Sequence, residues 1–186
     1  MSFTAEVKDE LSRVESGAVA ERAELAAIVR ICGTLSLSGA RRFRLALTTE
    51  TGSVARVAYT LLNGSKPLTC QLTVRRSVLH KTRNYLIEIP EQPELADALV
   101  ELGILVPGHG LAPGVPRNLL RTRSAISAFV RGAFMAGGFI ADPRGEFHLE
   151  IAVTGEEFAR ELVALISSFG AGARLNHRRG AYAIYL

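Results

Sequence analysis

A nine-residue pattern of small and apolar residues occurs twice in this chain, and it constrains the fold more than any other feature. The first copy, LAAIVRICG, spans Leu25 to Gly33, and the second, VRGAFMAGG, spans Val130 to Gly138. Each copy lies in a segment whose apolar residues recur at helical spacing, and each ends on glycine. Glycine inside a helix costs about 1 kcal/mol relative to alanine, so its repeated use needs a structural reason.

Close packing of the two helices supplies that reason. Small residues spaced about four apart lie on one face of a helix and let a second backbone approach. We therefore expect Gly132 and Ala136 to face the helix that contains Ala27. The predicted seam residues are Ala27, Gly33, Gly132, Ala136 and Gly138.

The elements that follow the two copies repeat as well. Periodicity predicts the order helix, strand, helix, strand, strand in each half. The first half covers helices at 21–35 and 53–64, strands at 41–49, 68–76 and 84–90, and a closing helix at 93–103. The second half covers helices at 124–140 and 155–170 and strands at 146–153, 173–179 and 181–186. It stops on a strand, which indicates either a fragment of a longer chain or an asymmetric second half.

The same patterns predict the domain boundaries. A short amphipathic helix over residues 2–15, capped by Ser2, lies within an N-terminal segment at 1–20. The first repeat then covers 21–105, a Gly/Pro-rich linker covers 106–121, and the second repeat covers 122–186.

Composition excludes several classes of protein. The chain has 186 residues, of which 48% are hydrophobic and 22% charged, as in an ordered globular protein. Its net charge of +4 admits a nucleic-acid partner. No apolar run is long enough to span a membrane and no signal peptide is visible, so we expect a cytoplasmic, nucleoid-associated protein. Cys32 and Cys70 have neither disulfide nor zinc spacing.

The two motif copies resemble the LAGLIDADG motif, which defines a family of homing endonucleases with two such helices packed side by side. The segments FTAEVKDELSR, RGAFMAGGFIADPRGEFHLEIAV and ARLNHRRGAYAIYL are more specifically similar to the N-terminal part of the WhiA family of sporulation regulators. This resemblance covers almost the whole chain. It implies an α/β (α+β) fold: a pseudo-twofold saddle with two antiparallel sheets, paired central helices, and a helix-turn-helix domain outside this chain.

The motif positions that carry catalysis in the endonucleases are changed here. In that family the eighth motif residue of each copy is an acid that holds divalent metal at the DNA. The matching residues are Cys32 and Gly137, and neither side chain can bind Mg²⁺. We therefore expect no catalysis, no metal and no cofactor, and we interpret both residues as packing residues. Asp142 is interpreted as a turn cap. An active endonuclease is the alternative, and it requires acids that the motifs lack.

Arginines on the strands are the candidates for DNA contact, because phosphate contacts supply most DNA affinity. The candidates are Arg42, Arg44, Arg75, Arg76, Lys81, Arg83, Arg174, Arg178 and Arg179. Basic strand faces are also common solvated surfaces, so charge alone leaves both interpretations open. In the second half, Glu146, His148 and Glu150 align with Arg42 and Arg44, and the two carboxylates would repel phosphate there.

The resemblance also implies a function and partners. It implies a non-catalytic domain of a transcription regulator that acts on cell division and sporulation genes. The implied partners are DNA, a WhiB-like iron–sulfur regulator and RNA polymerase. A module that binds only protein stays open as an alternative. Because both halves of the pseudo-twofold lie in one chain, a monomer is expected.

Overall fold

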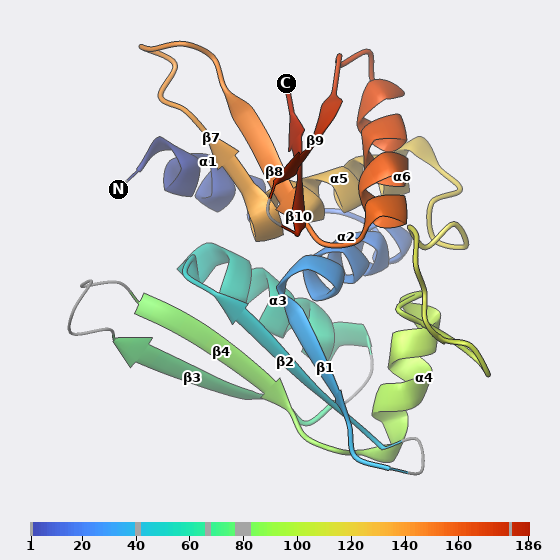
Figure 1. The fold of residues 1–186 in the computed structure, drawn as a ribbon. Coiled ribbons are helices and arrows are strands. Elements are labelled where there is room, and N and C mark those ends of the chain that lie inside the picture. Colours follow the sequence, from blue (N-terminus) through green and yellow to red (C-terminus); the bar gives the residue numbers. More distant parts are fainter. Residues whose placement is uncertain (1, 40–41, 66–67, 77–82, 179) are drawn as a thin grey trace.

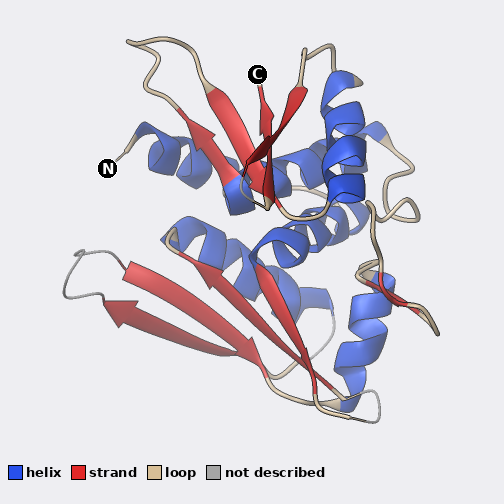
Figure 2. Ribbon diagram, in the orientation of Figure 1, coloured by secondary structure: helices blue, strands red, loops and turns tan. Residues whose placement is uncertain are grey.

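The structure is a computed structural model that describes residues 2–39, 42–65, 68–76, 83–178 and 180–186. Within these residues the chain forms six α-helices and two four-stranded antiparallel sheets. The sheets lie on opposite sides of a layer of helices, with the paired helices α2 and α5 at its centre (Figure 1). Figure 2, which is coloured by secondary structure, shows the same helices between the two sheets. The predicted α/β fold class is confirmed.

The element bounds are as follows. The first half comprises α1 Phe3–Leu11, α2 Ala18–Cys32, β1 Gly33–Leu37, β2 Phe43–Thr49, α3 Gly52–Ser65, β3 Gln71–Arg76, β4 Arg83–Ile89 and α4 Pro93–Glu101. A small hairpin follows, formed by β5 Leu105–Val106 and β6 Gly110–Leu111. The second half comprises α5 Arg123–Gly137, β7 Gly138–Ile140, β8 Leu149–Val153, α6 Glu156–Ser167, β9 Arg174–Arg178 and β10 Ala181–Tyr185.

The predicted order of elements was wrong in one respect, because each half contains a strand that periodicity missed. The helix ends at Cys32 in the first half and at Gly137 in the second, and a strand begins at the next residue. Gly33 and Gly138 both have extended backbone angles. In each half the strand follows its helix with no connecting loop, and apolar residues occur on both sides of the junction, so the sequence pattern merged helix and strand.

The two sheets have the same topology and the same register. Their strand orders are β1-β2-β4-β3 and β7-β8-β10-β9. Gly33 pairs with Leu47 in the first sheet, and Gly138 pairs with Ile151 in the second. Where both halves form strand, each residue of one half therefore has a defined counterpart in the other, which extends the sequence repeat to single positions.

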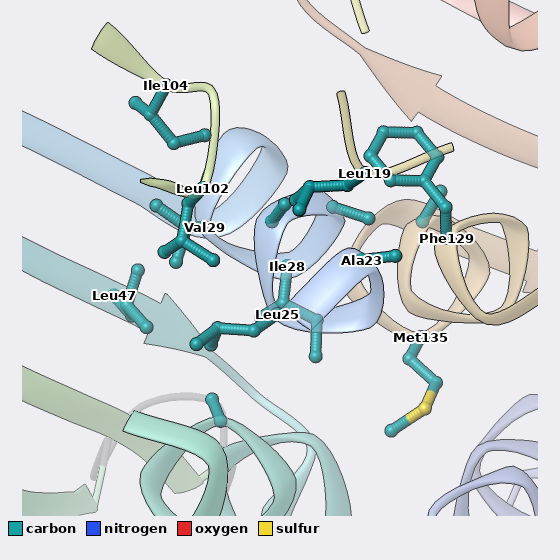
Figure 3. Packing of buried hydrophobic residues seen from close by; sticks show 14 of the residues in the cluster. Ala23, Leu25, Ile28, Val29, Leu47, Leu102, Ile104, Leu119, Phe129 and Met135 are labelled. Atoms are coloured by element: carbon teal, nitrogen blue, oxygen red, sulfur yellow. The ribbon is translucent and has the colours of Figure 1, made fainter. Parts of the chain in front are cut away.

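One hydrophobic core runs through both halves. It joins the covered faces of the sheets to both motif helices, and no boundary separates the halves within it. In Figure 3, Ala23 and Ile28 of α2 lie on the side of Leu119 and Phe129, which belong to the segment leading into the second half and to the second half itself. Figure 3 also shows that Leu47 of β2 and Leu102 after α4 reach the same cluster.

Helix α1 is shorter than predicted and closes a sheet edge. Ser2 accepts a hydrogen bond from the Ala5 amide, as expected for its cap, but the helix ends at Leu11 and Val14 is 49% exposed. The Thr4 hydroxyl donates to the Ile140 carbonyl at 2.8 Å and accepts from the Ile140 amide at 3.1 Å. These bonds satisfy the outer edge of β7, which would otherwise leave strand groups unpaired.

The segment predicted as a linker, 106–121, is packed against both halves. Arg30 of α2 donates to the Pro113 carbonyl at 3.0 Å. Glu161 of α6 accepts from the Val115 amide at 2.7 Å and also pairs with Arg117. The segment is therefore a strap that ties α2 to α6.

The two halves differ at the position of α4, which follows β4 in the first half and has no counterpart among the described elements of the second. In the first half, Ala98 and Leu102 share a small cavity with Leu25 and Leu62. In the second half, Val130 and Ile166 line an apolar groove together with residues of α1, β7 and β8. None of the described elements occupies this groove.

Candidate nucleic-acid interface

The seam between α2 and α5 is the closest approach between the two halves. A β-carbon on Gly132 would come 2.5 Å from the Glu24 carbonyl oxygen and 3.2 Å from the Ala27 β-carbon. The structure thus brings Gly132 and Ala27 together. It places Ala136 at the end of the same contact, where its carbonyl oxygen lies 3.8 Å from the Cys32 sulfur.

Gly33 and Gly138 sit at the helix–strand junctions, not in the seam itself. A β-carbon at Gly33 would meet the Val29 carbonyl and lie 3.3 Å from the Leu45 side chain. One at Gly138 would meet Phe134. These two glycines therefore allow the abrupt change from helix to strand rather than the helix crossing.

The motif positions that are acidic in the endonucleases lie at the C-terminal ends of α2 and α5. Gly137 has no room for a side chain, because a β-carbon there would meet the Ala152 carbonyl oxygen and lie 3.1 Å from the Ile31 methyl group. Burial raises the pKa of the Cys32 thiol to about 11, an effect partly opposed by the Lys8 ammonium. Within the described residues, no three His, Cys, Asp or Glu side chains form a metal-binding group.

Lys8 is a feature that the sequence pattern did not reveal. It lies on α1 beside Cys32, is only 8% exposed, and its ammonium lies 5.9 Å from the centre of the Phe134 ring. Burial lowers its pKa, and the proximity of Cys32 acts in the opposite direction. The helical spacing placed Val7 on the apolar face and gave no signal that the next residue is buried too.

The open face of the first sheet is polar but not uniformly basic. Arg44 lines a hollow of about 420 Å³ together with Thr34, Ser36 and Glu88. Arg42 forms an ion pair with Glu91 at 3.0 Å. Sequence reasoning missed both carboxylates, and one of them, Glu88, lies on the open face because strand residues alternate between faces.

The outer end of this sheet carries the most basic site. Arg75, Arg76 and Arg83 are exposed, and the structure gives none of them an ion pair or hydrogen bond to another described side chain. Arg76 and Arg83 are direct cross-strand partners, and Arg75 pairs with Asn84. Like charges directly opposite each other are unfavourable, so this hairpin end is suited to an anion. Lys81, another candidate, lies outside the described residues.

Of the three arginines proposed as DNA contacts on the second sheet, the structure describes the side chain of one. Arg174 is exposed at the start of β9. Arg178 lies at the end of β9, where only its backbone is described, and Arg179 lies outside the described residues. Asp142 accepts hydrogen bonds from the Arg144 side chain at 2.9 Å and from its amide at 3.0 Å, and these bonds lower its pKa.

Of the acidic face predicted for the second half, only Glu150 lies on a described strand, β8. His148 lies 3.4 Å from the Glu150 carboxylate, and its ring centre lies 6.2 Å from that of Phe139. Glu146 and His148 precede the strand, which begins at Leu149. The structure therefore separates two surfaces: a basic hairpin end on the first sheet and a mixed acidic and aromatic face on the second.

Comparison with known protein families identifies both halves. Residues 19–105 match the WhiA N-terminal LAGLIDADG-like domain, and residues 126–186 match the WhiA LAGLIDADG-like domain. Two curated relatives named "Probable cell division protein WhiA" are 35% identical over 189 residues (Desulforamulus reducens) and 37% identical over 188 residues (Desulfitobacterium hafniense). Each match covers the whole chain. The chain spans 59% and 58% of the length of these relatives.

Solved structures agree on the fold. The crystal structure of the N-terminal LAGLIDADG domain of WhiA covers 100% of this chain and 83% of its own, with a TM-score of 0.75 at 22% identity. Full-length WhiA from Thermatoga maritima covers 100% of this chain and 57% of its own, with a TM-score of 0.73 at 22% identity. The endonuclease I-DmoI, solved in complex with DNA and Mn, has a TM-score of 0.59 at 14% identity and covers 91% of this chain and 90% of its own.

No helix within the described residues has the length and apolar character needed to cross a membrane. The two domain matches, the whole-chain relatives and the shared fold lead to one conclusion: the chain belongs to the WhiA family and carries its LAGLIDADG-like domains.

Proposed function

We propose that this chain is a DNA-contacting, non-cleaving domain of a regulator that controls cell division and sporulation genes. The observation that carries the proposal is a group of exposed arginines at the end of the β3–β4 hairpin, Arg75, Arg76 and Arg83, none of which pairs with another side chain that the structure describes. Arginine binds phosphate bidentately, and phosphate contacts dominate DNA affinity. The hairpin lies at the outer edge of its sheet, away from the central helices (Figure 1), where a bound duplex could reach it.

The family and fold support the same proposal. The curated relatives are named as cell division proteins, and I-DmoI, which has the same fold, was solved with DNA bound. In the proposed regulator, Arg44 and Arg75 contact the DNA backbone from the open face of the sheet, and Arg76 and Arg83, which point to the other face, contact it from the end of the hairpin. Regions of the longer relatives outside the matched span would add sequence specificity. We include in the same proposal that this protein binds a WhiB-like iron–sulfur regulator and RNA polymerase.

Absence of cleavage is the second part of the proposal. An endonuclease of this fold needs two carboxylates at the helix ends to hold metal. Cys32 stays a protonated thiol at neutral pH, because its pKa is raised to about 11. The backbone of β8 fills the space beside Gly137. Together these features support a domain that does not hydrolyse DNA.

A pair of matched variants tests the proposed contact. In Arg76→Gln, one unpaired arginine of the hairpin is removed. In Arg160→Gln, another exposed charge is removed from the outer helix α6, where the arginine pairs with Glu156. We expect Arg76→Gln to weaken binding to a fluorescent duplex and to reduce the salt slope by about 0.9, the value of one phosphate contact. Equal effects of the two variants would refute a specific hairpin contact.

A further inference from the structure

Strand β3 is an exposed outer edge of the first sheet. The strand order β1-β2-β4-β3 makes it the last strand, so one of its sides pairs with β4 and its other side is the edge of that sheet. Five of its six residues are exposed and none is buried. An edge strand offers a row of backbone N–H and C=O groups to which another strand can pair. The edge of β3 is therefore open to an added strand.

One face of β3 carries apolar side chains that the helices leave uncovered. Leu72 pairs with Ile87 and Val74 pairs with Tyr85, on the face of the sheet that packs against the helices. Helix α3 reaches β4 on this face, because a β-carbon on Gly52 would lie 2.9 Å from the Tyr85 hydroxyl oxygen. Leu72 and Val74 are nevertheless 41% and 54% exposed. The helix layer thus covers β4 but leaves the apolar side of β3 in solvent.

Positive charge follows these apolar residues along the same strand. Arg75 and Arg76 are exposed, and neither pairs with a side chain that the structure describes. Successive strand residues point to opposite faces, so Arg76 lies on the face of Leu72 and Val74, and Arg75 lies on the open face. The edge therefore combines unpaired backbone, an apolar pair on one face and a positive charge on each face.

The equivalent strand of the second half lacks the apolar pair. Matching of the two registers makes Leu175 the counterpart of Leu72 and His177 the counterpart of Val74. His177 packs on Tyr182, with ring centres 4.8 Å apart. A polar ring is thus compatible with this position, and the packing of the sheet does not require an exposed valine there. The apolar character of the β3 edge indicates a partner that covers it.

Charge and shape decide between three classes of partner. A second copy of this chain would bring its own arginines to the same edge, and like charges facing each other are unfavourable. Duplex DNA offers phosphates, but it has no backbone that can extend a sheet and no apolar surface for Leu72 and Val74. An extended segment that alternates apolar and acidic residues matches all the features of the edge, because its side chains also alternate between faces.

We propose that β3 binds an extended acidic segment of a partner protein, which adds to the first sheet as a further strand. In the bound state, apolar side chains of the segment pack on Leu72 and Val74, and its carboxylates pair with Arg75 and Arg76. This inference does not rest on the proposed DNA contact, because the backbone edge and the apolar pair take no part in that contact. The two arginines serve both partners, so duplex DNA and the acidic segment compete for this hairpin.

The test measures binding of a fluorescein-labelled peptide of alternating valine and glutamate to the full chain by fluorescence anisotropy. One comparison peptide has lysine in place of glutamate, and another has a methyl group on every backbone nitrogen. We expect the lysine peptide to bind at least about tenfold more weakly, because it would meet two arginines. The methylated peptide should lose binding, since backbone hydrogen bonds supply the affinity in strand addition.

Matched valine variants test the apolar contact. Val74→Ser should weaken binding of the valine–glutamate peptide about fivefold, because the serine offers little apolar surface to cover. Val106→Ser is the control, since Val106 is a valine of strand β5 that is 40% exposed. It should leave the peptide affinity unchanged. Circular dichroism of each variant checks that it is folded.

Several outcomes would overturn the proposal. Equal weakening by Val74→Ser and Val106→Ser would remove the apolar contact, and full binding of the methylated peptide would remove the added strand. A dimer in sedimentation experiments that Val74→Ser dissociates would assign the edge to a second copy of the chain. Binding of duplex DNA that Val74→Ser weakens as much as it weakens peptide binding would assign the apolar pair to DNA.

Discussion

Gly132 lies so close to Glu24 that residue 132 cannot carry a β-carbon without moving one of the motif helices. The hypothetical β-carbon would be 2.5 Å from the Glu24 carbonyl oxygen. That contact is made by backbone, which cannot rotate away as a side chain can. The glycine that weakens α5 as an isolated helix is therefore the residue that lets the two halves join.

We expect Gly132→Ala to destabilise the fold even though alanine favours a helix. The helix preference of alanine contributes about 1 kcal/mol, while overpacking costs about 1–3 kcal/mol or more. Gly64→Ala is the control, because Gly64 also lies in a helix but a β-carbon there has nothing within 4 Å. Urea denaturation should show a lower midpoint for Gly132→Ala and an equal or higher midpoint for Gly64→Ala. A stabilised Gly132→Ala variant would contradict the tight seam.

The same helix pair contains a buried ion pair whose removal should be costly. Arg131 donates to both carboxylate oxygens of Glu24, at 2.9 and 2.5 Å, and the two side chains are only 11% and 6% exposed. Loss of one partner leaves the other charge buried, at a cost of about 3–5 kcal/mol. We expect Arg131→Met to be strongly destabilising.

A double-mutant cycle tests whether the two charges act as a pair. Arg131→Met combined with Glu24→Gln should cost clearly less than the sum of the single changes, because no unpaired charge is left behind. Strict additivity of the two changes in the free energy of unfolding would show that the residues act separately.

Alternation along a strand could be predicted from the sequence, whereas helix–strand junctions and contacts between distant segments could not. The alternation of Leu45 and Leu47 placed β2 correctly, and both residues are buried. The short strands after Cys32 and Gly137 were missed because their apolar residues continue the helical run. The burial of Lys8 and the pairing of Arg42 with Glu91 depend on segments far apart in the chain, and local periodicity carries no signal for them.

Glu161 should make the strap sensitive to acid. Burial pushes the pKa of Glu161 up, but hydrogen bonds from Arg117 and from the Val115 amide outweigh burial, and the net shift is downward. A depressed pKa in the folded state adds stability above the unfolded pKa of about 4.3, and that stability is lost as the pH falls through the folded value. Wild type should therefore lose more stability than Glu161→Gln when the pH falls from about 6 to 3.

The exposed position of Arg117 keeps this effect small, because solvent screens the pair. Chemical denaturation at several pH values gives the two stability curves. Parallel curves for wild type and Glu161→Gln would mean that the strap contact contributes nothing to folding.

Acids at the motif positions should not restore a metal site. The Gly137→Asp side chain would meet the β8 backbone, so we expect a destabilised variant. Cys32→Asp provides one carboxylate, beside the Lys8 ammonium, which would pair with it in place of a metal. Thermal melts with and without Mg²⁺ should show no metal-dependent rise for either variant or for both together. A clear rise in the double variant would show that the helix ends still form a metal site.

The most direct test of the central claim is binding of the chain to duplex DNA across a salt series with Mg²⁺ present, followed by measurement of DNA length. We predict binding that weakens steeply with salt, with a slope of about −0.9 for each phosphate contact, and DNA that is recovered intact. Binding that is absent even at low salt would contradict the proposed DNA contact at the β3–β4 hairpin. Shortened DNA would contradict the loss of catalysis at Cys32 and Gly137.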